Sequence, residues 1–292
     1  MKLLRTLTGR GRLRLAAAAA LLVPCSVLAA CGGGEAEDPG GVTTLDVAMF
    51  PLTDMAPIYL GIDKGYFAEE KINVVPKMLD GGPAVTAAVM SGDAQIGFSN
   101  PLTLVVGKAK GLPLTAVAPA TAGASSPDKA WAAVVVRNDS PIRSPQDLAG
   151  KTVAVNAVKN ILDLTLRASL EKHGVDPDSV NQVEIPFPET AAALSAGRVD
   201  AAFTAEPYLT QIKRDDARVI MTPYEDVALN LPSSLYFTTQ PFLQSQSDAV
   251  AGFRRALAKS VTYANEHPDE TRNIVSTFTE ICLLYTSPSP RD

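Results

Sequence analysis

The sequence predicts an α/β protein with two similar lobes, each built on a mostly parallel sheet that is flanked by helices. Short apolar segments alternate along the chain with longer helix-like segments, and this order occurs twice. Strands and helices that alternate in this way form parallel sheets through right-handed crossovers. The chain has 292 residues, of which 46% are hydrophobic and 20% charged, and this is enough for two ordinary globular domains.

A repeated stretch supports the division into two lobes. Residues 83–99 read PAVTAAVMSGDAQIGFS and residues 188–204 read PETAAALSAGRVDAAFT, and the two align without a gap. In each copy a proline opens an alanine-rich run, a glycine closes it (Gly92 and Gly197), and an apolar segment ends in phenylalanine and a hydroxyl residue. Proline suits the first turn of a helix and glycine its C-cap. Each copy therefore predicts a helix, a strand and a loop, with chance similarity between two alanine-rich segments as the alternative.

The remaining elements follow the same order in both halves. Apolar runs and turn residues around the first copy predict helices at 58–70 and 101–110 and strands at 43–50, 72–75, 114–120 and 131–137. Around the second copy they predict strands at 152–155, 180–185, 219–221 and 235–238, and helices at 161–173, 207–214, 248–265 and 268–279.

The N-terminus predicts a secretory signal peptide over residues 1–30. Basic residues precede an apolar stretch at 15–30, which is too short and too broken for a comfortable membrane span. Its end, Leu28-Ala29-Ala30-Cys31, resembles the lipobox of bacterial lipoproteins and implies lipidation of Cys31, which several acyl chains together would hold stably at a membrane. An ordinary secretory signal with an incidental cysteine is the alternative. Residues 31–41 are rich in glycine and predict a flexible tether.

Composition excludes some partners and some forms of stabilisation. The formal net charge of −5 offers no broad attraction for nucleic acid, whose binding depends on clustered lysine and arginine. Of the three cysteines, Cys25 is expected to leave with the signal peptide, Cys31 is the expected lipidation site and Cys282 lies near the C-terminus. The remaining body has no pair of cysteines for a disulfide, so we expect its core to stabilise it.

The last twelve residues, 281–292, follow no helical period and end in a serine-proline run. They resemble a translated sequencing-adaptor read-through, which implies that the natural protein is truncated here and continues past about residue 280. A natural disordered terminus is the alternative.

Several segments resemble one protein family. These are IYLGIDKGYFAEE at 58–70, SPIRSPQDLAGKTVAV at 140–155, EPY at 206–208 and ANEHPDE at 264–270, with the glycine turns that close the repeated helices. They are similar to the solute-binding proteins of ABC importers for nitrate, sulfonates, taurine and thiamine-pyrimidine precursors, the NMT1/THI5-like and SsuA-like group. The resemblance covers about residues 42–280, and it is more specific for the fold and for a transport receptor than for the ligand.

This resemblance implies a periplasmic-binding-protein fold of type II, with two lobes joined by two crossing strands. We expect lobe 1 to comprise 42–135 and 225–280, lobe 2 to comprise 136–224, and the hinge to lie at 133–138 and 220–234. The family implies a lipid-anchored, extracytoplasmic, monomeric receptor that passes a small solute to an ABC permease with a cytoplasmic ATPase. No cofactor or metal is expected, and the family's final helices, which return to lobe 1, would be missing.

The sequence also predicts where a ligand lies. In open α/β sheets, ligands bind beyond the carboxyl ends of the strands, and helix N-termini there receive anions. Glycines allow close approach, and hydroxyls, amides and aromatic rings contact the ligand. We expect the ligand contacts to come from Thr53, Asp54, Gly81, Gly82, Ser99, Asn100, Asn156, Lys159, Asn160, Phe187, Glu189, Thr204, Glu206 and Tyr208. Capping, core packing or a solvated surface position is the alternative for each of them.

No catalytic constellation is apparent in the sequence. His173 and His267 lie at predicted helix ends and have no paired cysteine, histidine or acid at the spacing of a metal site. There is no Walker loop and no nucleophile elbow, so we expect the chain not to be an enzyme. A pyrimidine-precursor synthase with the same fold, and a sensor or adhesion lipoprotein without a permease, are the two alternatives.

Overall fold

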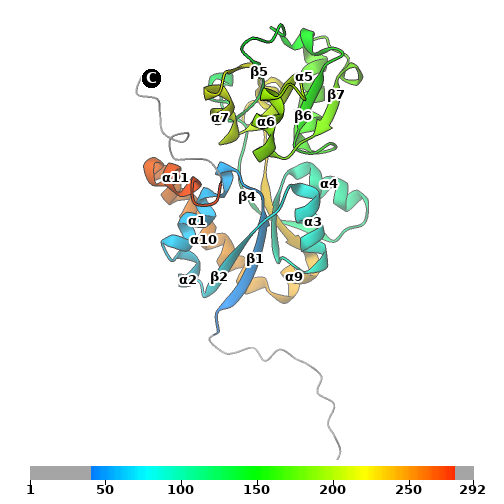
Figure 1. The fold of residues 1–292 in the computed structure, drawn as a ribbon. Coiled ribbons are helices and arrows are strands. Elements are labelled where there is room, and N and C mark those ends of the chain that lie inside the picture. The colour runs from blue at the N-terminus through cyan, green and yellow to red at the C-terminus, as the bar shows by residue number, and fades with distance from the viewer. Residues whose placement is uncertain (1–40, 280–292) are drawn as a thin grey trace, which may run out of the picture. The chain divides into compact units, whose positions relative to one another are not determined.

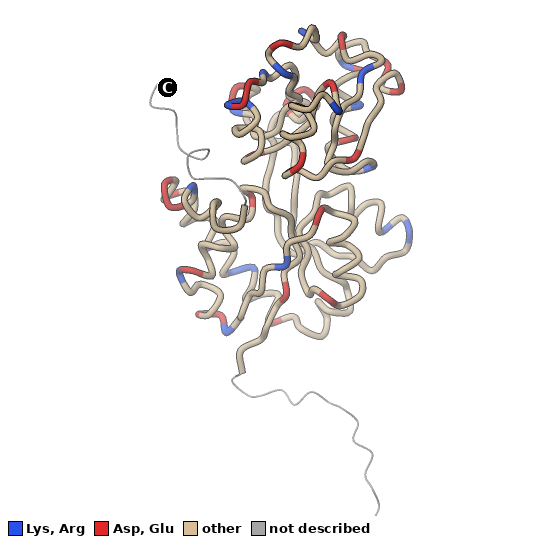
Figure 2. Tube along the Cα trace, in the orientation of Figure 1, with Lys and Arg blue, Asp and Glu red and all other residues tan. Residues whose placement is uncertain are grey.

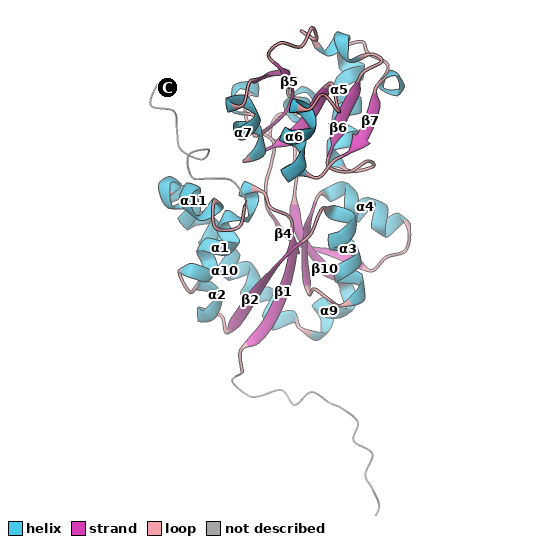
Figure 3. Ribbon diagram, viewed as in Figure 1, coloured by secondary structure: helices cyan, strands magenta, loops and turns pink. Residues whose placement is uncertain are grey.

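The computed structural model describes residues 41–279, which contain two five-stranded sheets with helices packed against them (Figures 1 and 3). The predicted signal peptide, the predicted lipidation at Cys31 and the predicted artefactual tail at 281–292 lie outside the described residues. Both sheets are mixed, with most strands parallel, as the sequence predicts.

The first sheet has the strand order β2-β1-β3-β10-β4. Its strands are β1 Thr43–Met49, β2 Ile72–Met78, β3 Ile96–Ser99, β4 Leu114–Pro119 and β10 Leu235–Thr239. Strand β10 is antiparallel to both of its neighbours. On one side lie α1 Ala56–Asp63, α2 Tyr66–Glu69, α10 Ser247–Glu266 and α11 Pro268–Val275 (Figure 1). On the other lie α3 Gly82–Ser91, α4 Pro101–Ala109 and α9 Gln240–Ser245.

The second sheet has the order β7-β6-β8-β5-β9. Its strands are β5 Ala132–Arg137, β6 Thr152–Val155, β7 Asn181–Glu184, β8 Ala201–Ala205 and β9 Ala217–Met221. Its helices are α5 Ile161–Lys172, α6 Thr190–Ser195, α7 Tyr208–Arg214 and α8 Pro223–Val227. Successive residues of β5 are buried on opposite faces of the sheet, because the side chains of a strand alternate in direction. Val135 packs in one cluster with Leu209 of α7, whereas Val134 belongs to the cluster that contains Leu166 of α5.

The repeated stretch folds the same way in both sheets. Val47 of β1 pairs with Ile96 of β3, and Val153 of β6 pairs with Ala201 of β8, so that aligned residues of the two copies occupy the same register. The antiparallel strands β10 and β5 then take equivalent places, and each ladder is interrupted by a shift in register at the same point. The prediction of two similar lobes is confirmed.

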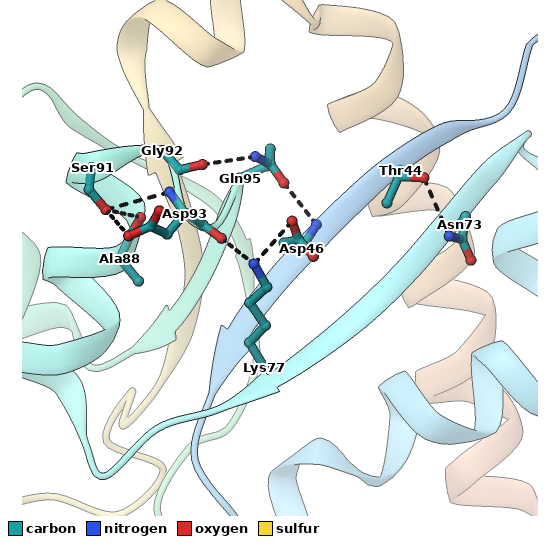
Figure 4. Close-up of polar contacts among 9 residues, drawn as sticks. All are labelled: Thr44, Asp46, Asn73, Lys77, Ala88, Ser91, Gly92, Asp93 and Gln95. Atoms are coloured by element: carbon teal, nitrogen blue, oxygen red, sulfur yellow. Dashed lines mark hydrogen bonds and ion pairs between the residues drawn. The ribbon is translucent and has the colours of Figure 1, made fainter.

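A side chain in each copy supports this frame at the start of the strand. The Asp46 amide donates to Gln95 Oε1 at 2.8 Å (Figure 4). The main chain of Gln95 donates back, from its N to Asp46 O at 2.9 Å. In the second copy the Thr152 amide donates to Asp200 Oδ2 at 2.8 Å, and Asp200 N donates to Thr152 O at 2.9 Å. Gln95 and Asp200 are aligned in the repeat, so two different side chains make the same main-chain bond.

The first sheet has an additional clamp at its edge, which Figure 4 also shows. Lys77 of the edge strand β2 pairs with Asp46 Oδ2 at 3.2 Å and donates to Asp93 O at 2.6 Å. Asp93 in turn accepts from Ser91 Oγ at 2.8 Å. Strand β2 is thereby tied to the turn that follows α3.

The cores of the two sheets compensate in volume at equivalent positions. Phe237 of β10 pairs with Gly97 of β3, and a Cβ atom added at Gly97 would lie 2.6 Å from Phe237 Cζ. In the second sheet the equivalent pair is Val135 of β5 with Ala202 of β8. The first sheet therefore pairs a large side chain with a glycine where the second sheet pairs two side chains of intermediate size. Close packing of each core requires that the pair fill its space.

The chain passes between the sheets twice, at 120–131 and at 222–234. We call these stretches the crossover segments. They run side by side, with Gly123 N donating to Leu231 O at 2.7 Å and Asn230 N donating to Ala124 O at 3.1 Å. The lobe boundary expected at residue 135 lies within β5, which belongs entirely to the second sheet, as does most of the hinge expected at 133–138. The hinge range expected at 220–234 contains the second crossover segment.

Candidate ligand-binding cleft

A cavity lies where the carboxyl ends of strands from both sheets meet the crossover segments. The residues around the first sheet that line it are Phe50, Leu52, Asp54, Gly82, Phe98, Ser99 and Asn100. The lining residues from the second lobe are Asn156, Asn160, Ile161, Leu162, Phe187 and Ala205. The crossover segments add Trp131, Tyr224, Ser233 and Ser234. This is the position at which open α/β sheets bind ligands.

Two asparagines at the cavity cap helices with their side-chain oxygens. Asn100 Oδ1 accepts from Thr103 N at 3.0 Å at the start of α4, and Asn160 Oδ1 accepts from Asp163 N at 3.1 Å at the start of α5. Asn160 Nδ2 also donates to Asn156 Oδ1 at 2.9 Å. These bonds use the side-chain oxygens of Asn100 and Asn156 as acceptors. Their side-chain nitrogens are left as donors, since within residues 41–279 neither Nδ2 has a protein acceptor.

The walls of the cavity approach one another closely. Gly82 begins α3, and a Cβ atom added there would lie 2.8 Å from Ser99 Oγ, so glycine keeps this wall open. A Cβ atom added at Gly81 would lie 3.9 Å from Asn156 Nδ2 of the second lobe. Thr53 N also donates to Glu206 O at 3.4 Å. Groups from the two sheets thus lie within reach of one small ligand.

Aromatic rings form much of the apolar lining. Phe50 packs edge-on against Phe98, with ring centroids 5.1 Å apart, and Phe187 lies on the side of the second lobe. Trp131 packs at 5.0 Å against Tyr224, and its indole Nε1 donates to Ala122 O at 2.9 Å. Since that bond satisfies the indole nitrogen, the ring presents an apolar surface to the cavity.

Asp54 is the charged side chain among the residues that line this cavity. It lies in the short helical turn Thr53–Met55 after β1, and its Oδ2 accepts from Ser234 Oγ at 3.3 Å. Burial raises the pKa of its carboxyl group above the ordinary value. Burial, and then the nearby charge of Asp54, raises the pKa of the fully buried Tyr224. Hydrogen bonds from the side chains of Thr121 and Ser234 and from the Asp54 main chain oppose the rise in the pKa of Asp54 and take the place of a cationic partner among the lining residues.

The structure brings half of the expected ligand contacts to the cavity, namely Asp54, Gly82, Ser99, Asn100, Asn156, Asn160 and Phe187. Thr53 and Gly81 lie beside the cavity without lining it, as their neighbours in the chain show. Whether any of these residues contacts a ligand stays a prediction.

The other expected contacts lie in the second lobe, outside the set of lining residues. Lys159 and Glu189 are exposed. Thr204 is buried within β8, and its Oγ1 has no hydrogen-bond partner in the described residues. Tyr208 is buried and stacks on Phe187, with centroids 6.2 Å apart.

Glu206 has a local partner at the start of α7. Its carboxylate accepts from Thr210 N at 3.1 Å and from Thr210 Oγ1 at 2.8 Å. Burial raises the pKa of this carboxyl group, and the Thr210 bonds oppose the rise. The peptide bond between Glu206 and Pro207 is cis. Through the two Thr210 bonds, the Glu206 carboxylate is tied to the first turn of α7.

Four of the lining residues outside the expected set come from the crossover segments. Trp131, Tyr224, Ser233 and Ser234 belong to no repeated motif and follow no strand of the parallel set. They reach the cavity because the two crossover segments are hydrogen-bonded to each other, and this pairing joins residues more than 100 positions apart in the chain. The one tryptophan of the chain, in an otherwise polar connection, was the available signal.

Each histidine has an acidic neighbour in the fold, a contact that the spacing in the sequence does not indicate. His173 Nε2 lies 3.2 Å from Asp226 Oδ2, which also accepts from Ser169 Oγ at 2.5 Å, and this cluster ties α5 to α8. His267 Nδ1 lies 4.0 Å from Glu270. The pairings arise from helix contacts and not from a sequence motif. Among residues 41–279 the structure groups no three histidine, cysteine or acidic side chains as metal ligands.

A second hollow lies on the second lobe, away from the cleft. Its lining includes Arg137, Asp139, Ser195, Asp215 and Asp216. Arg137 binds Asp139 through two hydrogen bonds, at 2.9 and 2.7 Å, so its charge is already paired. Charged residues of both signs are interspersed along the described chain (Figure 2). None of the described helices has the length and apolarity needed to cross a membrane.

The fold and the cleft define the class: a two-lobed binding protein with its cavity between two α/β sheets. The chain belongs to the NMT1/THI5-like family, whose model matches residues 52–271. It is 23% identical over 262 residues to the formylaminopyrimidine-binding protein of Halalkalibacterium halodurans, covering 88% of this chain and 77% of that protein. It is 26% identical over 226 residues to the 4-amino-5-hydroxymethyl-2-methylpyrimidine phosphate synthase of Aspergillus parasiticus, covering 73% of this chain but 64% of that protein.

The fold is also that of a solved binding protein. The alkanesulfonate-binding protein SsuA from Xanthomonas axonopodis pv. citri, bound to MOPS, superposes with a TM-score of 0.72 at 15% sequence identity. The match covers 84% of this chain and 82% of that structure. The predicted periplasmic-binding-protein architecture is confirmed.

Proposed function

We propose that this chain is the extracytoplasmic solute-binding receptor of an ABC importer. It captures a small organic molecule or anion, of the sulfonate, nitrate, taurine or pyrimidine-precursor class, and delivers it to a permease that a cytoplasmic ATPase drives. The observation that carries this proposal is the cavity itself, because residues of both sheets and of both crossover segments line it. A ligand held by both lobes favours the arrangement in which they are close together.

The crossover segments support a hinge in this proposal. They are short, they are bonded to each other, and together they form the covalent connection between the sheets. Rotation about such segments separates two rigid lobes with little change inside either of them. This proposal keeps the lobes at 42–135 with 225–280 and at 136–224, except that all of β5, Ala132–Arg137, is assigned to the second lobe. Solute release follows from opening.

Seven residues supply the polar and aromatic ligand contacts in this proposal: Asp54, Gly82, Ser99, Asn100, Asn156, Asn160 and Phe187. The receptor acts as a monomer, since one chain provides both walls of the cavity. A lipid on Cys31 holds it at the outer face of the cell membrane, and residues 31–41 form the tether. The basic and apolar N-terminal sequence supports export.

An enzyme is the second candidate, because one relative is a pyrimidine phosphate synthase. The residues that line the cavity include no histidine, cysteine, lysine or arginine, and their titratable groups are Asp54 and Tyr224. Histidine is the most common general acid or base, and the lining has none. Burial raises the pKa of Tyr224 away from neutral pH, so Asp54 is left as the one candidate acid or base. The lack of a second such group to act with Asp54 favours binding without turnover.

Thermal unfolding with a panel of solutes tests the proposal. We expect at least one sulfonate, nitrate, taurine or pyrimidine to raise the melting temperature of the purified chain in a concentration-dependent way, since a ligand that binds only the folded state stabilises it. The solute should be recovered unchanged after incubation. A panel without any stabilising solute contradicts the receptor function, and conversion of a solute into product favours the enzyme.

A further inference from the structure

Helix α8, in the second crossover segment, directs three consecutive side chains to three different parts of the molecule. Tyr224 lines the cavity and packs against Trp131, with ring centroids 5.0 Å apart. Glu225 Oε1 accepts from Ala124 N of the first crossover segment at 2.8 Å. Asp226 contacts α5 of the second lobe. The position of a cavity wall therefore depends on what holds this short helix in place.

The tie between Asp226 and α5 is made by several groups. Asp226 Oδ2 accepts from Ser169 Oγ at 2.5 Å and lies 3.2 Å from His173 Nε2. Lys172 Nζ donates to the main-chain oxygen of Asp226 at 2.6 Å. Ser169 is fully buried, and the side chain of Asp226 is 20% exposed. Hydrogen bonds to a carboxylate are stronger than neutral ones, and salt screens them little when they are buried, so these contacts hold α8 to the second lobe.

The tie between Glu225 and the first crossover segment is weaker. Among the described residues, Ala124 N donates to one carboxylate oxygen of Glu225, and the other oxygen is buried without a partner. A buried acceptor that stays unpaired keeps the cost of its desolvation. Of the two ties, the one to Ala124 is therefore the easier to break when the lobes rotate.

The end of the second crossover segment is tied to the first lobe instead. Ser234 Oγ donates to Asp54 Oδ2 at 3.3 Å, and it accepts from Thr121 N, directly after β4, at 3.0 Å. Residues 228–232 lie between Ser234 and α8, and Asn230 within them has a left-handed backbone with a φ of 56°. The segment is thus anchored to a different lobe at each end, with 228–232 between the anchors.

Trp131 belongs with the second lobe, because it directly precedes β5 and its main-chain oxygen accepts from Glu206 N at 2.9 Å. We propose that Asp226 is a positioning residue for the ligand: it fixes α8 to α5, so that Tyr224 and Trp131 stay together as one wall that moves with the second lobe. Bending of the second crossover segment is then confined to 228–232. This inference rests on the proposed receptor function and assigns part of the cavity to one lobe.

Tryptophan fluorescence tests the tie without any solute, because Trp131 is the one tryptophan of the chain. In the full chain with Asp226→Ala, α8 loses its hold on α5 and the Tyr224 ring leaves the indole. Acrylamide should then quench the selectively excited indole about 2-fold more strongly than in the wild type, since local opening exposes it. Ser169→Ala should act in the same direction, and the two changes together should add little, because both remove one hydrogen bond.

Asp178→Ala is the matched control for the loss of a carboxylate bound to α5. Asp178 accepts from Arg167 Nη2 of α5 at 2.6 Å, but its side chain is 80% exposed and it lies outside α8. Quenching in this variant should equal that of the wild type. Circular dichroism should show each variant folded, and Ser169→Ala carries the comparison if Asp226→Ala does not fold.

Calorimetric titration extends the test to binding, with nitrate, taurine, ethanesulfonate and 4-amino-5-hydroxymethyl-2-methylpyrimidine as probes. Any probe that binds the wild type should bind Asp226→Ala about 3- to 10-fold more weakly, because the loosened wall must be ordered again around the solute. Asp226→Asn keeps an acceptor for Ser169 and should recover most of the affinity and of the protection from acrylamide. Asp178→Ala should bind each probe like the wild type.

The outcomes separate this inference from the function on which it rests. Wild-type quenching in Asp226→Ala overturns the inference even if the variant is less stable, since α8 then stays in place without this carboxylate. Stronger quenching with unchanged binding of every probe overturns the positioning role while the receptor function stands. If no probe and no solute of the wider panel binds the wild type, the receptor function fails, and the positioning role for a ligand fails with it.

Discussion

The two lobes share a frame and differ in what they offer a ligand. Gln95 and Asp200 make the same main-chain bond in the two copies, and the strand registers match. At the cavity the aligned positions diverge: Gly82 in one copy corresponds to Phe187 in the other, and Asn100 corresponds to Ala205. The strand pairing depends on main-chain bonds, and different side chains can support those bonds. The residues of the loops at the strand ends can therefore differ without a change in the pairing.

The comparison extends into the cores. Phe237 over Gly97 in the first sheet and Val135 with Ala202 in the second fill equivalent positions with different pairs of side chains. The total volume is constrained at each position, but its division between neighbouring strands is not. In the core, a larger side chain on one strand is therefore matched by a smaller one on its neighbour. At the cleft, the aligned residues differ in size and chemistry without such a match.

The largest expected effect comes from removing the ring that is particular to the first sheet. Phe237 is fully buried, and Phe237→Ala should lower the free energy of unfolding by about 3–5 kcal/mol, because it leaves a cavity against Gly97. Val135→Ala at the equivalent position of the second sheet should cost clearly less, since fewer atoms are removed. Urea unfolding followed by circular dichroism measures both, and equal losses would contradict the proposed difference between the two cores.

Gly97→Ala introduces the residue of the second copy into the first. The new Cβ atom would meet Phe237 and also Val89 Cγ2 at 2.8 Å, so we expect a loss of about 1–3 kcal/mol from overpacking. Combining it with Phe237→Val recreates the pair type of the second sheet. The double variant should then lose less stability than the sum of the two single variants. Simple additivity would show that the two sites do not compensate.

The two side chains that support the frame should have similar energies despite their different chemistry. Gln95→Ala and Asp200→Ala each remove an acceptor for a main-chain amide at the start of a strand, and each should lower the free energy of unfolding by about 1 kcal/mol. Gln95→Glu is a milder control that keeps an acceptor. Chemical unfolding measures all three, and a neutral effect of one alanine variant beside a loss in the other would break the equivalence of the lobes.

The smallest expected effect concerns Asp54 without a ligand. Burial raises the pKa of its carboxyl group above that of the unfolded chain, so the folded state holds this proton more tightly. Stability from this group is therefore greatest in acid and falls as the pH rises through the folded pKa. At neutral pH, Asp54→Asn should raise the free energy of unfolding of the ligand-free chain by about 0.5–1 kcal/mol.

Melting temperatures across the acidic range measure this effect. The advantage of Asp54→Asn over the wild type should shrink as the pH falls toward the pKa of an unfolded aspartate. Asp63→Asn, which changes an exposed residue of the same lobe, should not reproduce the gain at neutral pH. A destabilised Asp54→Asn at neutral pH would show that the carboxylate serves the fold and not a ligand.

The fold was largely predictable from the sequence because its signals are local. Proline and glycine at the ends of the repeated helices, and apolar runs at the strands, mark each element where it stands in the chain. The exchange of strands was harder to see. Strand β5 follows β4 in sequence but lies in the other sheet, since only pairing with β8 and β9 determines its place.

Half of the expected ligand contacts line the cavity, because they too are marked by local signals in the sequence. Residues at strand ends and helix starts, such as Ser99 and Asn160, follow from the rule that ligands bind at those ends. Trp131 and Tyr224 reach the cavity through the pairing of the crossover segments, which leaves no periodic pattern. Of the three acidic residues expected at the ligand, Asp54, Glu189 and Glu206, Asp54 alone lines the cavity. Glu206 is engaged by Thr210 instead.

A crystal structure of the full chain with the solute that most raises its melting temperature tests the central claim most directly. We expect that solute between the two sheets, in contact with lining residues of both lobes. A ligand that contacts one lobe only, or that lies in the hollow beside Arg137, would contradict the account.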